Sequence, residues 1–166
     1  MITSVYTDRL HLRYLTENDI ELFHEMQHDI RVMQHITGFI FSREENEKDL
    51  KKVIAAYKKE KNDFWVWAVD FNNRFIGTGA IIKNEKKEWE IGYRFLPDYW
   101  GKGFGTEVAK ALIDIAFTKM HVDSLFAYAD KENLATVKIL DQLFNFVKEE
   151  WNEKDQCIDR IYKLSN

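Results

Sequence analysis

The sequence has little cysteine, proline or glycine: one, one and seven residues respectively in a chain of 166. The single cysteine, Cys157, excludes an internal disulfide, so we expect a protein of a reducing compartment, the cytoplasm. Pro97 is the single proline. The sequence also contains no repeat, low-complexity tract or linker-like segment. We therefore predict one domain spanning residues 1–166.

Long apolar runs and an excess of positive charge are also missing. No apolar stretch approaches the length of a transmembrane helix, and residues 1–8 lack the apolar segment of a secretion signal, so we expect neither membrane insertion nor secretion. The net charge is −4, and the lysines between residues 51 and 61 have acidic neighbours in the same segment. Nucleic acid is therefore not an expected partner.

Apolar residues make up 45% of the chain, and their spacing alternates between strand and helix periods. Strand periodicity predicts strands over 10–14, 64–71, 74–83, 88–96, 125–129, 146–151 and 158–164. Helices are predicted over 16–29, 42–61 and 133–143 and directly after residues 101–105, with 36–41 as an apolar connector. The order of these elements indicates an α/β (α+β) fold: a mixed, mostly antiparallel sheet of six to seven strands with helices on both faces.

Local signals support several of these boundaries. Thr16 with Asp19, and Ser42 with Glu45, are typical of helix N-termini, and Asn133 is a third candidate cap. Asn72-Asn73 between two apolar segments predicts the turn of a β-hairpin.

The most informative segment runs from Glu90 to Glu107. It combines a strand, a turn, the glycine-rich loop Gly101–Gly105 and a helix start. Glycines allow positive φ and close approach of a ligand, and the free N–H groups of a helix N-terminus favour a phosphate. Lys102 adds a positive charge. By itself, Gly-x-Gly-x-Gly is equally consistent with a tight turn that packs a helix on a sheet. Its spacing fits neither a Walker loop nor a dinucleotide fingerprint.

The wider segment resembles the acetyl-CoA-binding motif of the GNAT N-acetyltransferases, and most of all their RimJ/RimL-like branch. That branch reads Glu-Ile-Gly-Tyr, then Pro-x-Tyr-Trp-Gly-Lys-Gly and aromatic-Gly/Ala-Thr-Glu, which matches Glu90–Tyr93 and Pro97–Glu107 here. Thr7–Arg13 is similar to the first strand of the branch, and Glu132–Lys138 to its Glu-Asn-x-x-Ser-x-Arg segment. The resemblance therefore extends over nearly the whole chain.

This resemblance implies acetyl-CoA as the acetyl donor. The loop from Gly101 to Thr106 would bind the pyrophosphate through backbone N–H groups, and the pantetheine arm would pair with the strand like an additional strand. Trp100 is expected to pack the loop. The full set of expected cofactor-binding residues is Tyr93, Arg94, Phe95, Trp100, Gly101, Lys102, Gly103, Phe104, Gly105, Thr106 and Asn133.

The expected catalytic residues are Glu90, Asn133 and Thr136. An amine must lose its proton before it attacks, and Glu90 is the candidate base; the alternative is a surface strand residue paired with a lysine. Asn133 would anchor substrate or pantetheine, in addition to capping a helix. Many family members have a tyrosine near the position of Leu140 that protonates the leaving thiolate. Leucine cannot do this, so Thr136 or Tyr128 would be the proton donor here. Asn145 replaces a family glycine, which predicts a left-handed backbone there.

A rival motif is His24-Glu25-Met26-Gln27-His28, a literal His-Glu-x-x-His on a predicted helix. Its spacing puts both imidazoles on one helix face, as in a zinc metallopeptidase. The ordinary alternative is two polar helix residues beside the amine site, with no metal.

The sequence thus predicts an N-acetyltransferase that transfers acetyl directly to a primary amine in a ternary complex. The acceptor, a protein N-terminus or a small molecule, is left open, as is the choice between monomer and homodimer. A catalytically silent acyl-CoA-binding module is the third hypothesis.

Overall fold

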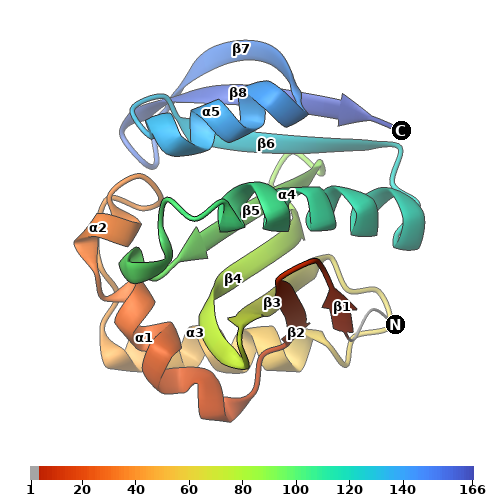
Figure 1. Cartoon of the computed structure of the whole chain (residues 1–166). Helices are drawn as coiled ribbons and strands as arrows, with labels where there is room; N and C mark the ends of the chain where they lie inside the picture. Colours follow the sequence, from red (N-terminus) through yellow and green to blue (C-terminus); the bar gives the residue numbers. More distant parts are fainter. Residues whose placement is uncertain (1–3) are drawn as a thin grey trace.

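A computed structural model describes residues 4–166. The prediction that residues 1–8 contain no secretion signal therefore falls partly, at residues 1–3, outside the described residues. One eight-stranded sheet organises the chain, in the order β1-β2-β3-β4-β5-β6-β8-β7 (Figure 1). The strands are β1 (Ser4–Tyr6), β2 (Leu10–Tyr14), β3 (Phe64–Phe71), β4 (Arg74–Lys83), β5 (Trp89–Phe95), β6 (Ser124–Asp130), β7 (Asn145–Asn152) and β8 (Cys157–Ser165). Every neighbouring pair is antiparallel except β5 and β6. The predicted mixed, mostly antiparallel sheet is confirmed, with one strand more than expected because β1 is a short edge strand.

Helices cover both faces of the sheet, as predicted. They are α1 (Ile20–Gln27), α2 (Ile30–Met33), α3 (Arg43–Ala56), α4 (Phe104–Asp114) and α5 (Leu134–Leu143). A 3₁₀ turn, Glu17–Asp19, precedes α1, and another, Pro97–Tyr99, follows β5. A π-helical turn, Ile115–Lys119, continues α4. No helix within residues 4–166 has the length and apolar character needed to cross a membrane.

The local signals acted as expected at most boundaries. Thr16 with Asp19 and Ser42 with Glu45 form capping boxes, and Asn133 caps α5. Asn72 and Asn73 have φ of 50° and 60°, as a tight hairpin turn requires. Asn145 differs from expectation: it begins β7 and is absent from the positive-φ residues, because the chain enters the strand directly after α5.

Helix α3 ends at Ala56 rather than at residue 61, and the short helix α2 was not expected. Beyond Tyr57, the charged segment has no apolar residue to bury before β3 begins, so packing cannot extend α3. The side chain of Asp29 accepts a hydrogen bond from the Arg31 N–H and starts α2.

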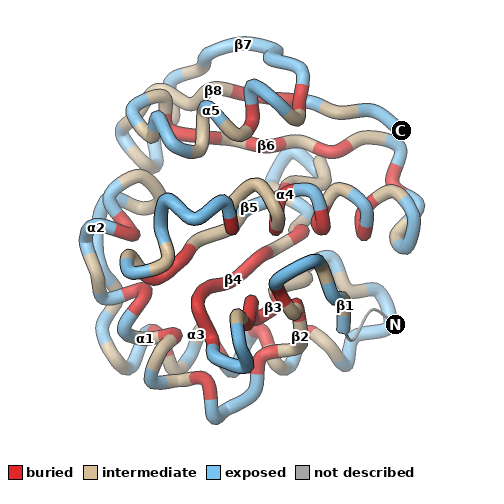
Figure 2. The backbone as a smooth tube through the Cα atoms, in the orientation of Figure 1, coloured by how far each residue is buried: buried red, intermediate tan, exposed pale blue. Residues whose placement is uncertain are grey.

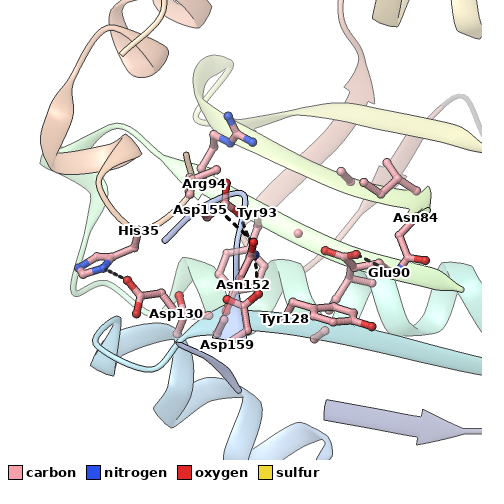
Figure 3. A pocket seen from close by; sticks show the side chains of 18 of the residues that line it. His35, Asn84, Glu90, Tyr93, Arg94, Tyr128, Asp130, Asn152, Asp155 and Asp159 are labelled. Atoms are coloured by element: carbon pink, nitrogen blue, oxygen red, sulfur yellow. Dashed lines mark hydrogen bonds and ion pairs between the residues drawn. The ribbon is translucent and has the colours of Figure 1, made fainter. Parts of the chain in front are cut away.

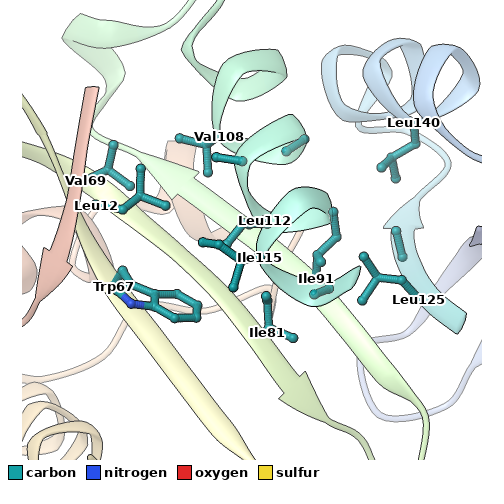
Figure 4. Packing of buried hydrophobic residues seen from close by; sticks show 14 of the residues in the cluster. Leu12, Trp67, Val69, Ile81, Ile91, Val108, Leu112, Ile115, Leu125 and Leu140 are labelled. Carbon is teal, nitrogen blue, oxygen red and sulfur yellow. The ribbon is translucent and has the colours of Figure 1, made fainter. Parts of the chain in front are cut away.

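Two apolar clusters lie on opposite faces of the sheet. The α4 face holds the larger one, in which Leu12, Trp67, Ile81, Val108 and Leu112 interdigitate (Figure 4). The α1–α3 face holds the smaller one, around buried residues such as Phe23, Met26 and Leu50. Strand β7 lies outside both and is mostly exposed (Figure 2). The two clusters fix β4 and β5 between helical layers, and the site lies on these strands.

Candidate active site

A cavity of about 780 Å³ opens where β5 and β6 separate. Each strand has seven residues, yet their register joins only Glu90 to Phe126 and Ile91 to Ala127. The other edge of β5 is paired with β4 along its whole length. From Gly92 to Phe95, therefore, one edge of β5 has no strand partner within residues 4–166 and can pair with an extended ligand.

The glycine loop presents a helix N-terminus near this opening. Gly101 and Gly103 have φ of +70° and +81°, in the left-handed region that favours glycine, and Gly103 is the N-cap of α4. The first N–H groups of α4, from Phe104 to Thr106, have no partner within the helix. They form a site suited to an anionic group.

Side chains of the loop serve mainly to hold its shape. Trp100 Nε1 donates to the Phe95 carbonyl at 2.9 Å, and Lys102 Nζ donates to the Asp98 carbonyl at 2.8 Å. Phe104 is buried in the core, and a Cβ on Gly105 would come within 2.9 Å of Ile139 Cδ1 on α5. Backbone N–H groups are thus what these residues can offer to a ligand.

A clamp on the loop escaped the sequence analysis. The Arg9 guanidinium donates to the Lys102 carbonyl at 2.8 Å, lies 4.6 Å from the centre of the Phe104 ring, and forms an ion pair with Glu107 at 2.7 Å. The Thr7 hydroxyl donates to the same carboxylate at 2.5 Å. The signal was present in the resemblance of Thr7–Arg13, but a structural role for it required knowing that this segment lies beside α4.

Glu90 lies on the cavity floor and accepts a hydrogen bond from Asn84 Nδ2 at 3.2 Å. Burial, with a smaller contribution from Asp159 and Glu88, raises its pKa to about 7. No lysine forms an ion pair with Glu90 among the described residues, so the paired-surface alternative does not hold. Glu90 is a half-buried carboxylate that can exchange a proton near neutral pH.

Tyr128 is unsuited to the proton-donor role considered for it. Its hydroxyl donates to Glu88 Oε2 at 2.6 Å. Burial, and then this carboxylate, raise the pKa of Tyr128 well above its usual value. The proton of Tyr128 is therefore held by Glu88.

Asn133, Thr136 and Tyr93 meet at the other side of the opening. The Asn133 side-chain oxygen accepts from the Thr136 N–H at 3.4 Å, and both residues line the cavity. The Tyr93 hydroxyl is buried beside the Thr136 side chain, and it forms no hydrogen bond of good geometry among residues 4–166. Burial raises the pKa of Tyr93 to about 12, and the Thr136 hydroxyl opposes that rise. Sequence reasoning assigned Tyr93 only a backbone role.

Three aspartates, Asp130, Asp155 and Asp159, border the cavity and form a carboxylate wall (Figure 3). Asn152 Nδ2 donates to Asp159 at 2.8 Å and to Asp155 at 3.1 Å, and His35 Nδ1 lies 2.7 Å from Asp130 Oδ2. Burial, followed by the neighbouring Asp155 and Asp130, raises the pKa of Asp159. Such a wall attracts an ammonium group.

The His-Glu-x-x-His motif does not build the zinc site of the rival hypothesis. The two imidazole rings lie 4.9 Å apart, but Nδ1 of His24 is hydrogen-bonded to Asn46 at 2.9 Å and Nδ1 of His28 to the Phe41 carbonyl at 2.8 Å. Within residues 4–166, no group of three His, Cys, Asp or Glu side chains is arranged to hold a metal ion. The two histidines are therefore helix residues that form hydrogen bonds with nearby protein groups.

Comparison with known proteins agrees with this geometry. The sequence profile of the acetyltransferase (GNAT) domain matches residues 9–143. An uncharacterized N-acetyltransferase of Bacillus licheniformis, p20, is 29% identical over 150 residues, which cover 88% of this chain and 83% of p20.

Solved structures share the fold over almost the full length. A GNAT-family acetyltransferase from Bacillus anthracis has a TM-score of 0.84 at 20% identity and covers 98% of both chains. The ribosomal-protein acetyltransferase RimL in complex with coenzyme A has a TM-score of 0.78 at 16% identity, covering 96% of this chain and 95% of RimL. A profile match over most of the chain shows that this protein belongs to the GNAT family of acetyltransferases, acyltransferases that use acetyl-CoA.

Proposed function

We propose that the chain is an N-acetyltransferase that moves the acetyl group of acetyl-CoA directly to a primary amine in a ternary complex. The observation that carries this proposal is the half-buried carboxylate of Glu90 on the floor of a cavity that opens between β5 and β6. The acceptor is a small-molecule amine or a protein N-terminal amine.

The residues of the opening fit acetyl-CoA. The unpaired edge of β5 from Gly92 to Phe95 suits the amide groups of pantetheine, and the loop from Gly101 to Thr106 suits its phosphates. The buried Tyr93 hydroxyl, which has no partner in the described residues, is a donor that a ligand would satisfy. When bound, acetyl-CoA supplies the acetyl group as a thioester, from which the amine displaces the thiol.

Glu90 is the general base that removes a proton from the acceptor amine. A lysine-type amine has a pKa of about 10.4 and is almost fully protonated at neutral pH, so it has no lone pair with which to attack. A carboxylate with a pKa of about 7 is a suitable general base, acting directly or through one water. The carboxylate wall favours arrival of the ammonium form, which then gives its proton to Glu90.

We assign proton donation to the departing sulfur to the hydroxyls of Tyr93 and Thr136, because the two side chains lie close together and both residues line the cavity. Asn133 keeps its side-chain NH₂ for a ligand, because its oxygen is used by the helix cap. An acyl-cysteine step is excluded from the proposal: burial raises the pKa of Cys157 to about 12, and the thiol does not line the cavity.

The test is release of free thiol from acetyl-CoA in the presence of amines and N-terminal peptides, with and without a chelator. Amine-dependent release that survives chelation is the expected result. Binding of acetyl-CoA without turnover of any amine would instead favour the silent-module hypothesis. Loss of activity with chelator and a stoichiometric metal would contradict the proposal and favour the His24–His28 motif.

A further inference from the structure

Arg94 is a cation on the cavity side of β5, four residues beyond Glu90. Glu90, Gly92 and Arg94 share one face of the strand, and all three line the cavity. The side chains of Glu90 and Arg94 extend toward different ends of it (Figure 3). Between them Gly92 leaves the floor open, since a Cβ there would meet nothing within 4 Å.

The guanidinium of Arg94 has no counter-ion in the part of the chain that the structure describes. Its Nη1 donates to Gln27 Oε1 at 2.7 Å and lies 3.7 Å from Met33 Sδ, and these are its hydrogen-bond partners within residues 4–166. No carboxylate of that range lies within 4.0 Å of it. Burial lowers the pKa of Arg94, an effect that the more distant Asp49 opposes. Its Nε and Nη2 groups have no hydrogen-bond partner within residues 4–166, and a partly buried cation without an anion is costly.

Arg94 is nevertheless held in a fixed position. Gln27, its partner, is buried and donates to Asn46 Oδ1 at 2.5 Å and to Asp49 Oδ2 at 3.3 Å. Asn46 is fully buried and is hydrogen-bonded to His24. This chain of amides joins α1 to α3 behind the guanidinium, an arrangement that reduces the entropy lost when Arg94 binds a ligand.

The anion that would form an ion pair with Arg94 is not a phosphate of coenzyme A. Those are assigned to the N-terminus of α4, and α4 packs on the opposite face of β5, the one that carries Ile91 and Phe95. A doubly charged phosphate is also disfavoured by Asp49, Asp130 and Glu90, which line the same cavity. A single carboxylate suits the planar guanidinium.

We infer that the acceptor is an amine that carries a carboxylate, with the carboxylate bound by Arg94 and the amine near Glu90. This inference rests on the proposed acetyl transfer and names its substrate class. The Cα atoms of residues four apart in a strand are separated by about 13 Å, so several atoms must separate the two groups of the acceptor. A free ω-amino acid has this chemistry, and so does a peptide with an acidic side chain near its N-terminus.

The experiment compares matched acceptors in the full-length protein. 4-Aminobutyrate, 5-aminovalerate and 6-aminohexanoate are each assayed beside their carboxamides, which differ only in charge. For at least one chain length, the carboxylate is expected to have a kcat/KM roughly 10- to 100-fold higher, mainly through KM, because an ion-paired hydrogen bond is lost in the amide. Peptides with Asp or Asn at the second position, compared in the same way, distinguish a peptide source from a small molecule.

Arg94→Gln is expected to abolish this preference, so that the ratio of kcat/KM for carboxylate to kcat/KM for carboxamide falls to about one. Arg31→Gln is the matched control, because Arg31 is exposed on α2, is paired with Asp29 and does not line the cavity. Equal rates for carboxylates and carboxamides in the wild type would overturn the inference and leave acetyl transfer intact.

A binding measurement separates the inference from the proposed reaction. The melting temperature is followed with N-acetyl-6-aminohexanoate and with its carboxamide, in the presence of coenzyme A. Stabilisation by the carboxylate alone, lost in Arg94→Gln, would support the site even if no amine were acetylated. Absence of both turnover and selective stabilisation would overturn the inference together with the proposed function.

Discussion

The two faces of β5 differ in the chemistry of their side chains. The face toward α4 carries apolar side chains in the larger core cluster. The opposite face carries a carboxylate, a glycine and a guanidinium that has no carboxylate partner among the described residues. The residues that face α4 are Ile91, Tyr93 and Phe95. The residues that face the cavity are Glu90, Gly92 and Arg94. Because successive strand residues alternate in direction, one seven-residue segment can stabilise the fold on one side and hold costly polar groups on the other. Substitutions should therefore separate stability from activity according to face.

The largest effect is expected from Phe95→Ala on the core face. Phe95 is 7% exposed, and its loss should lower the free energy of unfolding by about 3–5 kcal/mol. Denaturant titration with urea measures this change. Phe95 offers only its backbone to the proposed pantetheine site, so activity per folded molecule should remain close to the wild-type value. A selective loss of kcat in a stable Phe95→Ala protein would contradict the division between faces.

Glu90→Gln should give the opposite pattern, with kcat reduced about 10²-fold and the fold retained. The wild-type kcat/KM should rise with pH through about 7 as Glu90 loses its proton, and the glutamine variant should lack this rise.

Stability tests the same residue independently of activity. The folded protein keeps the Glu90 proton up to about pH 7, whereas the unfolded chain releases it near 4.5, so wild-type stability should fall as pH rises between these values. In Glu90→Gln this decrease, at most about 3 kcal/mol, should disappear. A pH dependence unchanged by the substitution would show that Glu90 does not titrate in this range.

Two glycines on adjacent strands provide a matched pair. A Cβ on Gly79 of β4 would lie 3.0 Å from Val108 Cγ1, whereas one on Gly92 meets nothing within 4 Å. Gly79→Val should therefore cost about 1–3 kcal/mol of stability through overpacking. Gly92→Val should leave the melting temperature nearly unchanged and lower kcat/KM for the amine roughly tenfold. Equal effects of both valines on stability would argue against an open cavity floor.

The smallest expected effect belongs to Tyr93→Phe, on the core face. The substitution removes a buried hydroxyl that has no partner in the described residues, so stability should stay the same or increase by up to about 1 kcal/mol. If Tyr93 donates a proton to the leaving sulfur, kcat should fall about tenfold. Thr136→Val tests the neighbouring hydroxyl in the same assay, and activity unaffected by either change would remove both from the mechanism.

Local signals in the sequence determined much of this protein. The asparagine pair at residues 72–73 set a hairpin, the capping pairs began helices, and the glycines of the loop allowed the positive φ that α4 requires at its start. Each of these depends on residues within a few positions of one another, so composition and spacing were sufficient. The resemblance of Glu90–Glu107 added the acetyl-CoA chemistry, which the family match bears out.

Tertiary structure alone decided how the site is completed. The divergence of β5 from β6, the clamp of Arg9 on Lys102 and the contact of Arg94 with Gln27 join residues far apart in the sequence, 93 and 67 positions for the last two. Their formation depends on how the two helical layers pack on the sheet, which no short-range pattern encodes. The same packing leaves the Tyr93 hydroxyl without a well-formed hydrogen bond and Arg94 without a counter-ion among residues 4–166, because burial and the absence of an opposite charge are properties of the assembled fold.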